Sequence, residues 1–211
     1  MTRPGLSVVA PLHDEEAVAA DLAGRCAAAA ARTGRTWELV FVDDASTDGT
    51  VAALEDAGVP IRLVRLPGNR GQWGATREGL ARARGDLVVV LDGDLQDPPE
   101  LIPRLLEAWD GDPWTVVFAT KTRREDPAWF RAGVAGYRVL QGILGAQIPR
   151  GAGSYCLLSG AVAERLARLE LPDANLAAAA VALGVRTRTV PFERAARGDG
   201  RSRVGPAGLV R

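Results

Sequence analysis

Residues 88–100, VVVLDGDLQDPPE, place several acids directly after a run of apolar residues. The acids are Asp92, Asp94, Asp97 and Glu100. Carboxylates that are brought close together raise one another's pKa or require a cation between them. Hard oxygen ligands suit Mg²⁺ or Mn²⁺, which bind through one or two carboxylates and complete their coordination with substrate phosphates. This segment therefore indicates the binding of a diphosphate through a divalent cation.

Two more acidic segments follow apolar runs nearer the N-terminus. The run LSVVAP leads to the segment HDEE at residues 13–16, and the run WELVFV leads to Asp43 and Asp44. If the three acidic segments meet in the fold, two carboxylates can hold the cation. The others can then accept hydrogen bonds from sugar hydroxyls and from a base N–H group.

Capping explains some of these polar residues without any ligand. Asp97 can begin a turn and cap the following helix, with Pro98 near its first position. Ser46 or Asp48 can cap the helix that follows the second acidic segment. Capping does not explain the adjacent pair Asp43 and Asp44. It also does not explain why Asp92 and Asp94 occur together.

The elements that position these acids are read from the hydrophobic pattern, in which apolar runs of strand length alternate with helical patterns. Continuous apolar runs are typical of strands buried on both faces, as in a parallel sheet covered by helices. The alternation predicts an α/β fold with an open, mostly parallel, doubly wound sheet flanked by helices in a single domain. Ligands of such sheets bind beyond the carboxyl ends of the strands, so the acids should converge on one edge. The expected strands are 6–11, 37–43, 61–66, 86–92, 114–120, 154–159 and 185–192, and the expected helices are 15–32, 48–57, 72–84, 98–109, 127–147 (as one or two helices), 160–169 and 173–183.

The segment NRGQWGA, residues 69–75, carries two glycines at the start of an expected helix. Gly71 and Gly74 allow the backbone to approach a ligand or another helix closely. The pattern is not the dinucleotide-binding G-x-G-x-x-G, and it does not follow the first strand.

Composition narrows the classes of protein. The 211 residues contain 26 basic and 26 acidic side chains, so net charge gives no support for nucleic-acid binding. Cys26 and Cys156 fit no metal-binding spacing, which favours a reduced, cytoplasmic protein. The N-terminus lacks the apolar run of a signal peptide, and no stretch reaches the ~20 apolar residues of a membrane span.

The ordered motifs resemble those of the family 2 inverting glycosyltransferases, which have the GT-A nucleotide-sugar fold. The form DxDLQxPPE is similar to that of the polyprenyl-phosphate sugar transferases, the dolichol-phosphate-mannose synthase group. The resemblance covers residues 5–203, taken as one GT-A domain, and leaves 204–211 as a mobile tail. The motifs are PLHDEE (11–16), VDDASTDGT (42–50), NRGQWGA (69–75), LDGDLQDPPE (91–100) and VPFERAARGDGRSR (190–203).

The resemblance implies roles for individual residues and a cofactor, Mg²⁺ or Mn²⁺. The donor would be a GDP- or UDP-sugar and the acceptor a phosphate, most simply a polyprenyl phosphate. An Arg fork matches the oxygens of such phosphates. The implied nucleotide-binding residues are Pro11, His13, Glu15, Asp43, Asp44, Gly71, Asp92 and Gly93; the metal-binding residues are Asp92, Asp94 and Gln96; the catalytic residues are Asp92, Asp94 and Arg194; and the phosphate-binding residues are Arg194, Arg197, Ser202 and Arg203.

The sequence departs from the family pattern in two places. His13-Asp14 stands where an aromatic residue and Asn are usual, which affects base contacts. Ser154 and Cys156 stand where Asp and Arg are frequent, which leaves acceptor recognition open.

Three alternatives remain at this point. An apolar strand followed by DxD also occurs in phosphatases that use an aspartyl nucleophile. In those enzymes the motif follows the first strand, whereas here it follows the fourth expected strand. The same fold can act on a small hydroxyl acceptor, which needs a general base, with Asp173 the nearest candidate. It can also serve as a non-catalytic nucleotide-sugar-binding subunit. The stretch around Trp129 could also contact the inner face of the membrane peripherally. A homodimer and a separate membrane partner subunit are two further possibilities.

Overall fold

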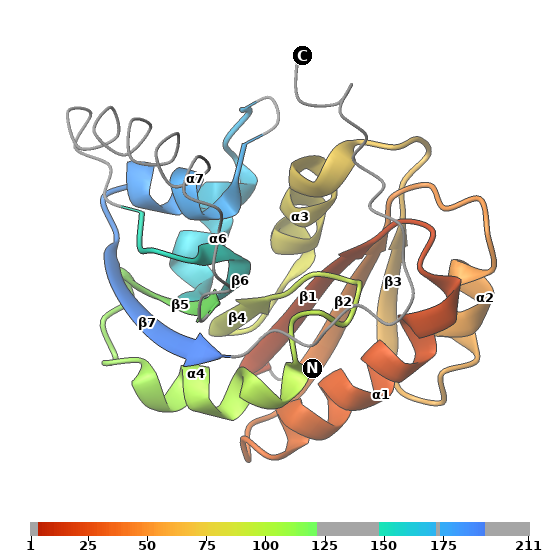
Figure 1. The fold of residues 1–211 in the computed structure, drawn as a ribbon, viewed down its shortest axis with the longest axis horizontal. Helices are drawn as coiled ribbons and strands as arrows, with labels where there is room; N and C mark the ends of the chain where they lie inside the picture. Colours follow the sequence, from red (N-terminus) through yellow and green to blue (C-terminus); the bar gives the residue numbers. More distant parts are fainter. Residues whose placement is uncertain (1–3, 122–147, 172–173, 193–211) are drawn as a thin grey trace, which may run out of the picture.

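The computed structural model describes residues 4–121, 148–171 and 174–192, and their strands form one seven-stranded sheet (Figure 1). The strand order across the sheet is β3-β2-β1-β4-β6-β5-β7. All seven expected strands are found close to their predicted positions. They are β1 (Leu6–Leu12), β2 (Trp37–Asp43), β3 (Ile61–Arg65), β4 (Leu87–Val90), β5 (Thr115–Lys121), β6 (Ala152–Ser159) and β7 (Arg186–Phe192).

The directions of the strands confirm the mostly parallel sheet. β1 pairs in parallel with β2 and β4, β2 with β3, and β5 with β7. β6 is inserted between β4 and β5 and runs antiparallel to both. Every residue of β1 and of β4 is buried, because helices cover the sheet on both faces.

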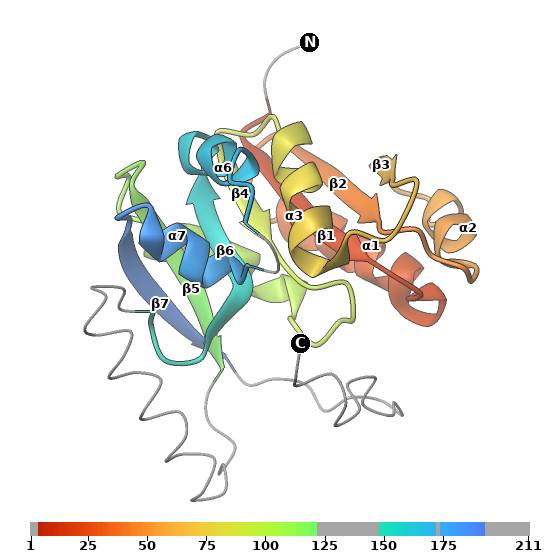
Figure 2. The ribbon, with the colours of Figure 1, turned by 90° about the horizontal axis from the view of Figure 1, so that it is seen from above.

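Helices cover the two faces of the sheet in two layers. α1 (Glu16–Ala31) and α4 (Ile102–Ala108) lie on one face, where α1 residues such as Leu22 pack with alternate side chains of β1 such as Val8. α3 (Gly71–Arg82), α6 (Gly160–Ala167) and α7 (Leu176–Ala182) form the layer seen from above in Figure 2. Their residues pack with the other face of β1 and β4.

Two short helices complete the described fold. α2 (Thr50–Glu55) packs beside α1, and a 3₁₀ turn, η1 (Pro99–Leu101), precedes α4. The segment 127–147, expected to form one or two helices, lies outside the described residues, as does the tail 204–211. The domain bounds 5–203 therefore remain a prediction. None of the described helices is long and apolar enough to cross a bilayer.

The strand directions bring the acidic segments together, as expected. The carboxyl ends of β1, β2 and β4 lie at one edge of the sheet because these strands are parallel. β6 begins at this edge because it runs the other way. Its register pairs Val90 with Cys156, which brings Ser154 opposite the residue two positions beyond Val90, Asp92.

Candidate functional site

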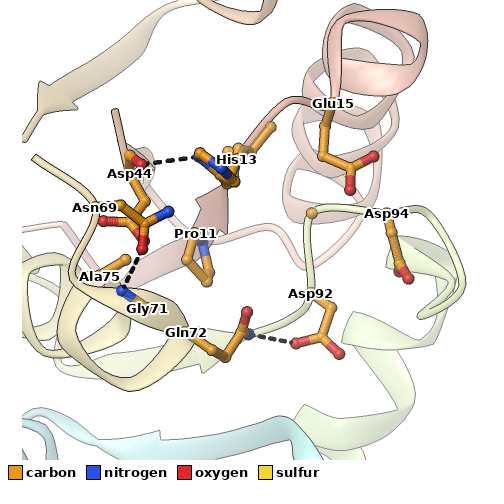
Figure 3. A pocket seen from close by; sticks show the side chains of 12 residues that line it. Pro11, His13, Glu15, Asp44, Asn69, Gly71, Gln72, Ala75, Asp92 and Asp94 are labelled. Carbon is orange, nitrogen blue, oxygen red and sulfur yellow. Dashed lines mark hydrogen bonds between the residues drawn. The ribbon is translucent and has the colours of Figure 1, made fainter. Parts of the chain in front are cut away.

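A cavity of about 280 Å³ lies at the carboxyl edge of the sheet. Segments that follow β1, β2 and β4 form its walls together with the first turn of α3 (Figure 3). Its size is close to the lower end of the range for ligand pockets, about 300–1,000 Å³. The lining residues are Pro11, Leu12, His13, Glu15, Asp44, Asn69, Gly71, Gln72, Ala75, Asp92, Gly93 and Asp94.

The charge of this lining is one-sided. Four carboxylates line the cavity, those of Glu15, Asp44, Asp92 and Asp94, and the described lining contains no Lys or Arg. Such a wall repels a free diphosphate, so an anionic ligand needs a cation to bind here. The wall also offers acceptor oxygens to sugar hydroxyls and base N–H groups.

In the segment after β1, His13 lines the cavity, whereas Asp14 has a structural role. Asp14 has a left-handed backbone (φ 53°), and its Oδ1 accepts a 2.7 Å hydrogen bond from the Thr47 N–H. This bond is the main reason why the pKa of Asp14 is lowered. Asp14 thus ties the first loop to the second. The Nδ1 of His13 lies 2.9 Å from the Asp44 carbonyl oxygen, which can only accept, so Nδ1 carries the proton.

The adjacent acids after β2 face different surroundings. Asp43 is 3% exposed, and its Oδ1 accepts a hydrogen bond of 3.1 Å from the Ser46 N–H. Asp44 lines the cavity, and its Oδ1 accepts a 2.7 Å bond from the Arg70 N–H. Both residues are 3% exposed, but only Asp44 is part of the cavity lining. The predicted base or ribose contact of Asp43 remains a prediction.

Two further acids near this loop have structural partners. Oδ1 of Asp48 accepts from the backbone N–H of Thr50 at the start of α2, but the N-cap of α2 is Gly49, so Asp48 holds the first turn from the position before the N-cap instead of capping the helix as expected. Its Oδ2 accepts from the Glu16 N–H, and the Glu16 carboxylate accepts from the Gly49 N–H. Ser46 accepts from a backbone N–H of the first loop rather than capping α2.

The segment after β4 presents both acids of the DxD pattern to the cavity (Figure 3). Oδ1 of Asp92 accepts hydrogen bonds from Gln72 Nε2 at 2.8 Å and from Ser154 Oγ at 2.5 Å. Oδ1 of Asp94 accepts from the backbone N–H two residues later at 3.1 Å. Gly93 lies so close to β1 that a Cβ there would be 2.6 Å from the Pro11 carbonyl oxygen.

Gln96 and Asp97, which follow the DxD pattern, are not part of the cavity lining. Gln96 is 5% exposed and is not part of the lining, so its role toward a metal remains a prediction. Asp97 is 1% exposed, and Pro98 rather than Asp97 stands at the N-cap of η1. Asp97 lies 3.7 Å from Lys121 Nζ and faces the Asp92 backbone N–H at 3.5 Å. The helix-capping interpretation of Asp97 is therefore replaced by an ion pair between this loop and the end of β5.

Within the described residues, no three His, Cys, Asp or Glu side chains are grouped so that they could hold a metal by themselves. Asp92 and Asp94 nevertheless fit Mg²⁺ or Mn²⁺, because these ions need only one or two carboxylates when substrate phosphates supply further oxygens. The donor set is all oxygen, as these hard ions prefer. The protein side of such a site is thus incomplete without a phosphate ligand.

The predicted acceptor residues cannot be placed. Arg194, Arg197, Ser202 and Arg203 lie in 193–211, outside the described residues, and so does Asp173. Their roles remain predictions. Gln72, Ser154 and Lys121 were not among the predicted site residues. Gln72 lies within the NRGQWGA segment and Ser154 at a departure from the family pattern, but the partners of all three side chains lie far away in the sequence, so no local pattern indicated these contacts.

The chain belongs to glycosyl transferase family 2, to which residues 7–163 match. It is 44% identical over 131 residues to the undecaprenyl-phosphate 4-deoxy-4-formamido-L-arabinose transferase of Pseudomonas aeruginosa, covering 60% of this chain and 38% of the relative. It is 32% identical over 213 residues to the protein of the same name from Edwardsiella ictaluri, covering 97% and 64%. The chain therefore spans less than two thirds of these relatives' length.

The fold is the expected GT-A fold. The solved mannosyltransferase PcManGT from Pyrobaculum calidifontis, in complex with GDP-Man and Mn²⁺, superimposes with a TM-score of 0.60 at 25% identity, covering 90% of this chain and 56% of that protein. The resemblance to polyprenyl-phosphate sugar transferases is confirmed by the relatives from Pseudomonas and Edwardsiella.

Proposed function

We propose that the chain transfers a sugar, with inversion, from a nucleoside-diphosphate sugar to a polyprenyl-phosphate acceptor, with the help of a divalent metal. The observation that carries this proposal is the cavity with four carboxylates at the carboxyl edge of the sheet. Family membership supports sugar transfer as the reaction class.

The donor half of the proposal is supported by the charge of the cavity. Asp92 and Asp94 would hold Mg²⁺ or Mn²⁺ against the diphosphate, and Glu15 and Asp44 would accept hydrogen bonds from the nucleoside or the sugar. When bound, the cation neutralises the charge that grows on the leaving diphosphate. PcManGT was solved with a nucleotide-sugar and Mn²⁺, which agrees with this assignment.

The acceptor half is supported by the relatives, whose names state transfer to undecaprenyl phosphate. An ionised phosphate oxygen attacks the anomeric carbon, and the bond from that carbon to the diphosphate oxygen breaks. No general base is required, because the nucleophile carries no proton to remove. The predicted phosphate-binding residues Arg194, Arg197, Ser202 and Arg203 would hold one of the two phosphates. An acceptor of this kind lies in a bilayer, so we also propose peripheral membrane contact.

A thermal-shift panel tests the donor site. UDP, GDP, CDP and dTDP are each added with and without Mn²⁺ to wild type, to Asp94→Asn and to Asp56→Asn, a control at an exposed position at the end of α2. A nucleotide at about a hundred times its Kd stabilises a protein by roughly 2.7 kcal/mol. One nucleotide should stabilise wild type and the control only with Mn²⁺, and the Asp94 variant should lose the effect. No shift with any nucleotide would refute the donor site.

A transfer assay separates the proposed acceptor from the alternatives. The donor selected by the panel is offered with a short polyprenyl phosphate and with the corresponding polyprenol. Transfer to the phosphate alone is expected. Transfer only to hydroxyl acceptors would refute the acceptor half. Metal-dependent nucleotide binding without transfer to either would indicate a non-catalytic binding subunit.

A further inference from the structure

The carboxylate of Asp92 is held by two side chains from different elements. Gln72 in the first turn of α3 and Ser154 on β6 both donate hydrogen bonds to Oδ1. They lie 20 and 62 residues away in the sequence. Rotation of the carboxylate would break both bonds, so its orientation is fixed. Among the described residues, both side-chain bonds to Asp92 use this one oxygen, which leaves Oδ2 as the available ligand.

Each donor is itself held in place by the fold. The start of α3 is anchored because the Arg70 N–H donates to Asp44 Oδ1 and the Gly71 N–H donates to Asn69 Oδ1. Ser154 is positioned by the antiparallel register of β6 against β4. A parallel strand at this place would have its carboxyl end at this edge, and a different residue would face Asp92.

The chemical type of the two donors matters. An Arg or Lys at either position would neutralise the carboxylate and compete with a cation for it. An amide and a hydroxyl are neutral, so they orient the carboxylate and leave its negative charge in place. Partners of this kind fix the orientation of metal-binding carboxylates in proteins.

We propose that Gln72 and Ser154 are positioning residues that set Asp92 for binding the metal–diphosphate part of the donor. This assignment rests on the proposed function. It also gives a role to Ser154, at a position where the sequence departs from the family pattern. Gln72 is exposed and Ser154 is partly exposed, so removal of either side chain leaves no buried void.

The test compares wild type with Ser154→Ala, Gln72→Ala, the double variant and the conservative variant Ser154→Thr. Mn²⁺ binding is followed by electron paramagnetic resonance at saturating GDP and, in parallel, at saturating UDP. The melting temperature without ligand is measured on the same samples. In the double variant the Kd for Mn²⁺ should rise about 10- to 100-fold. The melting temperature should stay unchanged, and Ser154→Thr should bind Mn²⁺ like wild type.

The outcomes distinguish this assignment from the function on which it rests. Wild-type binding of Mn²⁺ with a nucleotide, combined with unchanged binding in the double variant, would overturn the positioning role alone. A loss of Mn²⁺ binding that accompanies a lower melting temperature and is not restored by Ser154→Thr would overturn it as well, because the effect would be structural. Wild type that binds Mn²⁺ with neither nucleotide would overturn both.

Discussion

The carboxylate of Asp97 lies 3.7 Å from the ammonium group of Lys121, the single lysine of the sequence. This ion pair connects the DxD loop, residues 91–98, to the end of β5. The Asp97 side chain is 1% exposed and that of Lys121 is 32% exposed. A buried carboxylate needs compensating charge or hydrogen bonds, and the ammonium group supplies part of that compensation. The pair therefore contributes to holding the loop that carries Asp92 and Asp94.

Replacement of Lys121 by Met should lower the free energy of unfolding by about 1–3 kcal/mol. This value lies between those for exposed and fully buried pairs. Lys121→Arg keeps the charge and serves as the matched control, with stability close to wild type. Urea denaturation of the three proteins measures the difference. A Met variant as stable as wild type would show that the ion pair does not hold the loop.

Gly93→Ala should disturb the contact between the DxD loop and β1. A Cβ at this position would lie 2.6 Å from the Pro11 carbonyl oxygen, so the backbone must shift. Such overpacking costs about 1–3 kcal/mol, and the shift should also weaken Mn²⁺-dependent nucleotide binding. Gly153→Ala is the control, because its Cβ would meet no atom within 4 Å. Equal stability and binding in both variants would contradict the close contact.

The ion pair of Arg25 and Glu100 should affect how the free energy of unfolding depends on pH in the acidic range. Nε and Nη2 of Arg25 each donate a 2.8 Å hydrogen bond to the Glu100 carboxylate, and these bonds lower the pKa of Glu100. The pKa is lower in the folded state than in the unfolded state. The stabilisation is therefore present above the unfolded pKa, about 4.3, and is lost as the pH falls through the folded value.

Arg25→Met should accordingly lose about 0.5–1 kcal/mol at pH 7, where the exposed pair is partly screened by solvent and salt. The difference from wild type should shrink below about pH 4, as the carboxyl group is protonated. Arg168→Met removes a more exposed pair with Glu164 at the C-terminal end of α6 and should have a smaller effect. Urea denaturation at pH 3 to 8 gives the comparison. A difference that is constant across this range would contradict the role of Glu100 titration.

The strands could be predicted from the sequence because their physical cause is local. Runs such as that of β4 are apolar on both faces, and only a strand covered by helices on both sides accommodates this pattern. The meeting of three acidic segments followed from the parallel directions of β1, β2 and β4, which the alternation of strands and helices also predicts.

The details of the site could not be predicted, because they depend on turn geometry and on long-range topology. Asp43 and Asp44 are chemically identical, and their different surroundings follow from the pleat at the end of β2 and the left-handed turn at Ala45 (φ 58°). The bond from Ser154 to Asp92 depends on the insertion of β6 in the antiparallel direction, which hydrophobic periodicity does not encode.

The two thiols should be inert in the folded protein. Cys26 in α1 and Cys156 in β6 are both 0% exposed, and burial raises the pKa of each thiol. The thiolate is the reactive form, so a raised pKa and a lack of access both suppress reaction. Ellman's reagent at pH 8 should label neither thiol in native buffer and both in guanidinium chloride. Leu171→Cys, at a position that is 44% exposed, should react at once and confirms that the reagent is active. Rapid native labelling of wild type would mean that α1 or β6 opens readily, and would contradict the closed core on which the cavity is built.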